Sequence, residues 1–175
     1  MSDAPRESSQ DPAARLEAAL AELQRDLRAK QPVHRYHARA LLVPLGELIL
    51  AGEEAAARET DGGPRNGAPA GEDLAEAWTA RVREAVTPLE ERWTAAASEE
   101  LALACAEHVQ GVDPRFLDHP GYDFVYTVRA RERLEARLRA CGALDVELPE
   151  GLLARVAEAD ARLAPYLTDG LADGA

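Results

Sequence analysis

The sequence predicts an all-α protein, a bundle of five or six helices with antiparallel neighbours and no sheet. Alanine and leucine dominate the apolar residues and β-branched residues are few, which favours helix over strand. Apolar residues recur every three or four positions along several segments, and no segment of useful length alternates as a half-buried strand does. A chain of 175 residues can bury a core without a metal or a disulfide.

The two ends and one internal segment are expected to lie outside this core. Residues 1–11 are polar and serine-rich, so they predict a disordered tail. Residues 59–71 are rich in glycine and proline, which indicates a flexible linker, and residues 169–175 predict a second disordered tail. Residues 12–168 are therefore expected to form a single helical domain.

The first two helices are expected on either side of Pro32. The first begins after Asp11, a good N-cap, and carries an apolar stripe at Leu16, Leu20, Leu23 and Leu27. The second spans residues 32–58 and is interrupted by Pro44, which has no N–H group and clashes with the preceding turn. We expect either a kink or two short helices at this point.

A third helix is expected over residues 72–86, with an inward face formed by Leu74, Trp78, Val82 and Val86. Thr87, Pro88 and Glu90 then fit an N-cap, a first helical position and the glutamate of a capping box, so they predict a new helix that begins at Pro88. The apolar pattern continues in phase through Trp93, however. One long helix bent at Pro88 is an equal alternative.

The C-terminal third predicts a loop over residues 110–121 and two further helices. One spans residues 122–141, with Val125 among its inward residues and Gly142 as the residue after its end. The last spans residues 149–167. Two cysteines are too few for a disulfide framework, and both lie on apolar stripes, at Cys105 and Cys141.

The charge of the chain excludes several classes of partner. Its net charge of -12 repels phosphate backbones and anionic lipid headgroups, so we expect neither a nucleic acid nor a membrane as a partner. The N-terminus has no apolar segment of the signal-peptide type, and the longest apolar stretch, residues 38–51, is too short to span a bilayer. We therefore expect a cytoplasmic protein.

Arginine is concentrated in one segment. Residues 112–142 carry a net charge of +1 and lie between residues 72–111, at -6, and residues 143–175, at -5. We expect the arginine-rich helix to pack between the acidic segments, with carboxylates near Arg129, Arg133, Arg137 or Arg139. Exposed pairs of this kind contribute about 0–1 kcal/mol each, so they orient helices more than they stabilise them.

Two groups of residues could form a ligand site. His34 and His37 are three positions apart on one helical face and could bind a divalent metal, with Glu47, Glu107 or His108 as a third ligand. The segment from Asp118 through His119 to Tyr122 combines carboxylates, an imidazole and a phenol, although Asp118 also fits the N-cap of the next helix. Ordinary surface or half-buried histidines are the alternative for the first pair.

Three pairs of adjacent acids, Glu53-Glu54, Glu90-Glu91 and Glu99-Glu100, could contribute to a metal centre. Adjacent helical residues point about 100° apart, so each pair offers one ligand at most, and we expect solvated faces. Trp78 and Trp93 lie on one apolar stripe. They are either core residues or the anchors of an interface.

The sequence contains no nucleophile motif and no phosphate-binding glycine loop. We therefore expect a non-enzymatic interaction or accessory module without a cofactor. Its partner would be a protein, either a different one or a second copy of the chain, and its contacts would come from Trp78, Trp93, Arg129, Arg133 and Arg137. The alternative is a helical enzyme or a ligand-binding or metal-binding protein, with a site near His34, His37 and the segment 118–122.

Overall fold

The computed structural model describes residues 11–62, 71–119, 122 and 124–172, and throughout these ranges it confirms an all-α bundle without a strand. In chain order the elements are α1 (Pro12–Arg28), α2 (Arg35–Gly62), α3 (Gly71–Val86), the 3₁₀ turn η1 (Thr87–Leu89), α4 (Glu90–Gly111), α5 (Pro114–Leu117), α6 (Phe124–Ala143) and α7 (Leu152–Ala172). Six of these helices have 16 or more residues.

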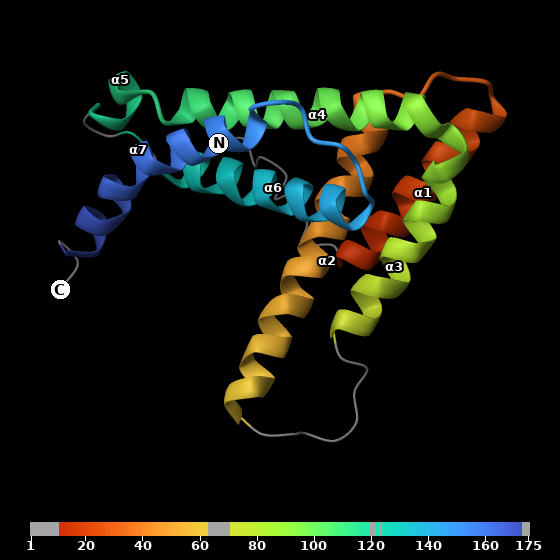
Figure 1. Ribbon diagram of the computed structural model, residues 1–175, viewed down its shortest axis with the longest axis horizontal. Coiled ribbons are helices and arrows are strands. Elements are labelled where there is room, and N and C mark those ends of the chain that lie inside the picture. Colours follow the sequence, from red (N-terminus) through yellow and green to blue (C-terminus); the bar gives the residue numbers. More distant parts are fainter. Residues whose placement is uncertain (1–10, 63–70, 120–121, 123, 173–175) are drawn as a thin grey trace, which may run out of the picture.

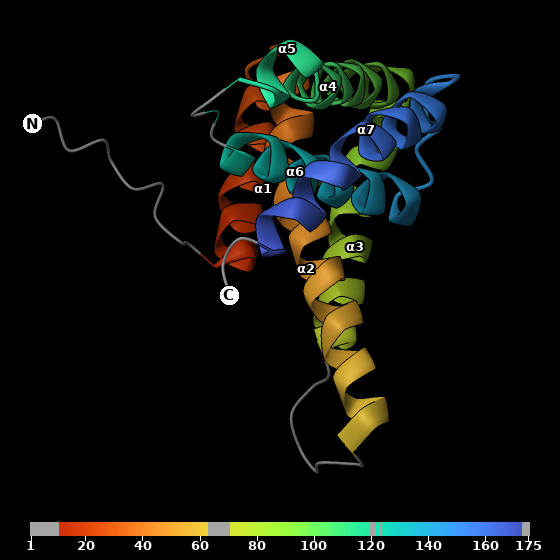
Figure 2. The ribbon, with the colours of Figure 1, turned by 90° about the vertical axis from the view of Figure 1, so that its left-hand side faces the viewer.

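The helices form two groups that cross at a steep angle (Figure 1). One group consists of α1, α2 and α3, which lie side by side, and the other consists of α4, α6 and α7. Figure 2 shows the second group lying across one end of the first. Helix α2 is central, because it packs against α1, α3, α4 and α6.

The crossing of α2 and α6 depends on a glycine. A Cβ atom added to Gly46 would lie 1.8 Å from the backbone carbonyl oxygen of Ala136, far inside van der Waals contact. Glycine is therefore required at this point of α2, because any side chain would force the two helices apart.

The core is built from the aliphatic stripes that the sequence predicted. Its largest fully buried apolar side chains are Leu16, Leu23, Leu41, Leu42, Leu45, Leu101, Leu134, Leu152, Val82 and Val112. Both cysteines are buried free thiols, and burial raises the pKa of Cys141 to about 12. Leu74 and Val125 were expected to point inward but are 46% and 48% exposed.

Helix α2 runs without a break through Pro44, so the prediction of two short helices is wrong. The missing hydrogen bond and the clash in the preceding turn cost roughly 3 kcal/mol in an isolated helix. Here the neighbouring Leu41, Leu42 and Leu45 are fully buried. Their burial offsets this cost, at roughly 1.5–3 kcal/mol for each side chain.

The chain turns sharply between α3 and α4, so the prediction of one bent helix is also wrong. The capping box is wrong too, because the hydroxyl of Thr87 donates to the carbonyl of Arg83, at 2.7 Å, instead of capping α4. Helix α4 begins at Glu90, whose φ angle of 45° is uncommon for a residue with a side chain. The corner is therefore formed by η1 and by the unusual backbone of Glu90.

Several boundaries differ from the expected ones. Helix α2 continues through residues 59–62 of the expected linker, and α7 continues through residues 169–172 of the expected tail. Gly142 lies inside α6, and the left-handed residue after that helix is Asp145, at φ 56°. The expected loop 110–121 contains α5, whose N-cap is Asp113. Residues 1–10, 63–70 and 173–175 lie outside the described part of the chain.

Candidate functional site

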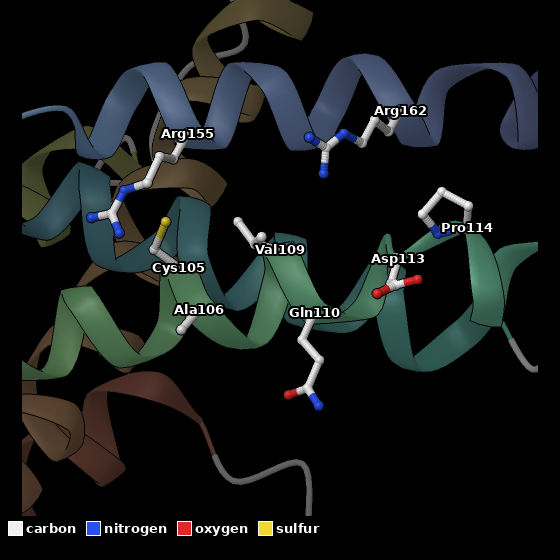
Figure 3. Close-up of a pocket in the computed structure, with 8 residues that line it drawn as sticks. All are labelled: Cys105, Ala106, Val109, Gln110, Asp113, Pro114, Arg155 and Arg162. Carbon is white, nitrogen blue, oxygen red and sulfur yellow. The ribbon is translucent and has the colours of Figure 1, made fainter.

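A groove lies between α4 and α7 and carries charged side chains (Figure 3). It has a volume of about 340 Å³. Its walls are formed by eight residues: Cys105, Ala106, Val109 and Gln110 of α4, Asp113 and Pro114 at the start of α5, and Arg155 and Arg162 of α7. Helices α4 and α7, which are not consecutive in the chain, run in the same direction along it.

The groove continues beyond α4 onto α5. A second hollow, of about 500 Å³, is lined by Pro114, Leu117, Ala161, Arg162, Pro165 and Tyr166. Pro114 and Arg162 line both hollows, so the two lie next to each other along the flank of α7. Both hollows are lined by a mixture of apolar and polar side chains, which is the usual composition of a binding groove.

The charges at the edge of the groove are predominantly positive. Arg155 and Arg162 project from α7 toward α4 (Figure 3). Arg162 forms an ion pair with Glu158, whereas Arg155 forms none with any described residue. Asp113 is held by Arg115, with a nitrogen–oxygen distance of 2.7 Å. The hydrogen bond from that guanidinium lowers the pKa of Asp113 to about 2, so the carboxylate is already neutralised by its own partner at neutral pH.

Helix α7 is held in place by a polar network on its other flank. His108 of α4 is fully buried, and its Nε2 lies 2.8 Å from Oδ1 of Asp160 on α7. The Nε of Arg131 on α6 donates to the same carboxylate, at 2.8 Å, and its guanidinium also pairs with Glu135. The network joins three helices, and the complete burial of His108 closes its ring to any substrate in solvent.

The interior of the bundle contains a second ion pair. Arg137 and Glu100 are 3% and 2% exposed, and the guanidinium Nη2 lies 2.8 Å from the carboxylate Oε1. The expectation that the paired acids face solvent is therefore wrong for Glu100, although its neighbour Glu99 is exposed as expected. The expectation that Arg137 pairs on the surface is wrong for the same reason: α4 and α6 pack directly over the pair.

The other arginines predicted to make contacts have different surroundings. Arg129 and Arg133 are exposed on α6. Arg139 pairs with Glu135 on its own helix and with Glu53 of α2. Arg131 of α6 pairs with Asp160 of α7, and the sequence did not single out this arginine.

The two histidines of the predicted metal site cap a helix. The backbone N–H of His34 donates to Nδ1 of His37, at 3.1 Å, so the remaining ring proton lies on Nε2. That Nε2 group donates to Oδ2 of Asp26, also at 3.1 Å. Neither nitrogen of His37 has a lone pair free for a metal ion in this arrangement.

The described residues of the segment 118–122 lie at the end of the groove that is next to α5. Asp118 ends α5 instead of capping the next helix, and its carboxylate accepts from the hydroxyl of Tyr166, at 2.6 Å. The hydroxyl of Tyr122 is 2.7 Å from that of Thr127 and also donates to the carbonyl of Gly111. His119 is exposed. These side chains join α5, α6 and α7 into one end of the molecule.

The predicted ligand residues therefore do not converge. The histidines lie at the start of α2 and the segment 118–122 follows α5, and Figure 1 shows the two places well apart. Among the described residues, no three His, Cys, Asp or Glu side chains are placed to share a metal ion. Of the proposed third ligands, Glu47 pairs with Arg15 and His108 with Asp160.

The tryptophans belong to the core and its edge. Trp93 is only 4% exposed, so it has the core role that its stripe also allowed. Trp78 packs partly buried against the same core, and the guanidinium of Arg81 lies 4.7 Å from the centre of its ring. Arg81 in turn pairs with Glu17 of α1, so one face of Trp78 is covered.

Sequence reasoning did not identify the groove. One signal was available, because Arg155 and Arg162 are seven residues apart and therefore share a face of α7. Which face of α4 lies opposite these two arginines depends on how α7 packs on the bundle, and the spacing within α7 does not show this.

Comparisons with known proteins give no match: no family model fits the chain, and it is significantly similar to no curated protein and to no solved structure. Within the described ranges, no helix is both long enough and apolar enough to cross a membrane. The site must therefore be interpreted from its own chemistry.

Proposed function

We propose that this chain is a protein-interaction module that binds an acidic amphipathic helix of a protein partner in the groove between α4 and α7. The observation that carries the proposal is the groove itself: an apolar floor with Arg155 and Arg162 at its edge, on a chain whose net charge is -12. Arginine beside apolar surface is a common composition of binding hot spots.

The shape of the groove favours a helix over a small compact ligand. The two hollows lie next to each other along α7, and Arg155 and Arg162 are two helical turns apart, about 10 Å along its axis. A partner helix places side chains at the same spacing, so apolar residues can occupy the floor while carboxylates meet the arginines. The net negative charge makes a nucleic acid an unsuitable partner for the rest of the surface.

The reducing cytoplasm is the compartment in which we expect the module to act. Both of its cysteines, Cys105 and Cys141, are free thiols buried in the core. Disulfides are rare in that compartment, and nothing in the described core depends on one.

A synthetic peptide tests the binding proposal. The probe is a fluorescent amphipathic helix with leucines on one face and glutamates on the other, and its control has lysine at every glutamate position. Fluorescence anisotropy should show that the acidic peptide binds the wild-type chain and the lysine peptide does not. Arg155→Glu combined with Arg162→Glu should weaken binding roughly tenfold or more, because two favourable pairs become repulsive.

A matched variant separates the groove from the overall charge. Arg39→Glu combined with Arg92→Glu changes the net charge equally at two exposed arginines outside the groove. This control should bind the acidic peptide like the wild type, apart from the small effect of net charge. Equal losses in the two double variants, or equal binding of both peptides, would show that the groove does not recognise an acidic helix.

A further inference from the structure

Part of the first helical group projects from the rest of the molecule. We define the arm as residues 51–62 of α2 together with residues 71–78 of α3. The two helices pack side by side, and in both Figure 1 and Figure 2 the arm extends beyond the other described helices. A projection of this kind adds surface that the core does not cover.

Both helices of the arm carry a net negative charge. Residues 51–62 contain four carboxylates and one arginine, and residues 71–78 contain three carboxylates and no basic residue. Asp73, Leu74 and Glu76 of α3 are exposed, and the Leu74 side chain is 46% exposed. The sequence pattern assigned Leu74 to the core, so its exposure on an acidic helix is an unexpected feature of the fold.

The exposed part of α3 has the chemistry that the groove requires. Leu74 supplies an apolar side chain for the floor at Ala106 and Val109. The carboxylate of Asp73 lies about 100° around the helix from Leu74 and supplies a partner for the arginines at the edge, and Glu76 lies a further 60° round on the same flank as Asp73. Charge and apolar surface are therefore complementary between the arm and the groove of the same chain.

We propose that the occupant of the groove is the arm of a second copy of this chain, so that copies associate head to tail. The proposal rests on the proposed function of the groove and names the partner. The arm and the groove lie at opposite ends of the molecule, so one copy cannot fill its own groove (Figure 1). Because the two contacting surfaces differ, each added copy leaves one arm and one groove open, and assembly proceeds to a ring or a chain.

Charge reversal on each surface tests this arrangement. The groove variant is Arg155→Glu with Arg162→Glu, and the arm variant is Asp73→Arg with Glu76→Arg. Sedimentation velocity over a series of concentrations should show that the wild type self-associates. Each variant alone should associate roughly tenfold or more weakly, because like charges then meet at the contact.

The decisive measurement is the chain that carries all four substitutions. Its arm is basic and its groove is acidic, so self-association should return toward the wild-type level while the net charge returns to the wild-type value. Damage to the fold cannot produce such a recovery. Circular dichroism of each variant checks the helix content, and Leu74→Ser should weaken association without any change of charge.

Two control variants carry the same changes of net charge elsewhere. Arg39→Glu with Arg92→Glu matches the groove variant, and Glu91→Arg with Glu132→Arg matches the arm variant, all at exposed positions. Both controls should associate like the wild type.

A wild-type chain that stays monomeric at every concentration overturns the second copy as partner. So does a four-substitution chain that fails to recover. In either case, binding of the acidic peptide to the groove still supports the proposed function, whereas loss of that binding removes both proposals.

Discussion

Replacing Gly46 by alanine tests the packing on which the whole arrangement depends. The new Cβ atom would lie 1.8 Å from the carbonyl oxygen of Ala136, and real Cβ contacts are essentially never shorter than 3.0 Å. The two helices must therefore separate locally by about 1.2 Å. The obstacle is the backbone of α6, which cannot rotate away as a flexible side chain can.

Two opposing effects set how much Gly46→Ala changes the free energy of unfolding. Alanine is favoured over glycine in a helix by roughly 1 kcal/mol, which would stabilise α2. Overpacking costs about 1–3 kcal/mol and more where the structure cannot yield, which applies at this crossing. The steric effect should win, so we expect Gly46→Ala to lower the free energy of unfolding by about 2 kcal/mol.

Gly142→Ala is the matched control, because this glycine also lies in a helix and an added Cβ atom there meets nothing within 4 Å. Only the propensity effect remains, so this variant should gain up to about 1 kcal/mol. Urea unfolding followed by circular dichroism measures both changes. A Gly46→Ala protein as stable as the wild type would refute the crossing of α2 and α6 at this residue.

Three further predictions follow from local geometry. Lys30 has a left-handed φ angle of 55° after the end of α1. Lys30→Gly should therefore raise the free energy of unfolding by up to about 1 kcal/mol, whereas Lys30→Ala should not. Equal effects of the two substitutions would contradict the left-handed conformation of this residue. Glu100→Ala leaves the buried guanidinium of Arg137 without its carboxylate, so it should lower the free energy of unfolding in urea by about 3–5 kcal/mol. Adding Arg137→Met should recover most of this loss, because no unpaired charge then remains buried. A double variant that is no more stable than Glu100→Ala would show that the pair is not buried. The pKa of Asp113 is lowered to about 2 by Arg115, so this carboxylate contributes stability above its ordinary pKa of 3.8 and loses the contribution as the pH falls toward 2. A carbon-detected NMR titration should show the Asp113 midpoint rising toward 3.8 in Arg115→Ala, and an unchanged midpoint would exclude the ion pair as the cause.

Helical periodicity predicted the fold because most of the stripes do face one core. Leu16, Leu20 and Leu23 all lie inward, as their spacing requires. The predictions failed where two local rules competed. At Pro44 the steric rule favours an interruption, and burial of the surrounding leucines keeps the helix continuous. At Thr87 the capping pattern was present, but the hydroxyl donates back to the carbonyl of Arg83 in α3 instead of capping α4.

The acid pairs show the limit of a pattern that considers one helix alone. Adjacent helical residues point about 100° apart, so one member of a pair can face inward while the other faces solvent. Glu99 and Glu100 behave in this way, with side chains 68% and 3% exposed. The spacing could not show which of them faces the core, because the partner, Arg137, comes from a helix about 37 positions later in the chain.

The groove was unpredictable for a related reason. It lies between α4 and α7, which are adjacent in space but separated in the chain by α5 and α6. The periodicity of α7 defines its inward stripe, at Leu152, Val156, Ala159 and Leu163. The periodicity does not define which flank of that stripe packs against another helix and which flank stays exposed to solvent. That choice depends on polar contacts made across the bundle.

The two flanks of α7 have different roles, because one holds the helix against the bundle and the other lines the groove. This difference makes the groove suitable for binding a partner. At 100° per residue, Asp160 lies about 140° around the helix from Arg155 and about 160° from Arg162. The flank of Asp160 is fixed by His108 and Arg131, while the flank of the two arginines is open to solvent. Charged residues on the open flank are therefore not required to hold the helix in place. A partner can pair with them without displacing a contact that supports the fold, and their substitution should change binding while leaving the position of α7 intact.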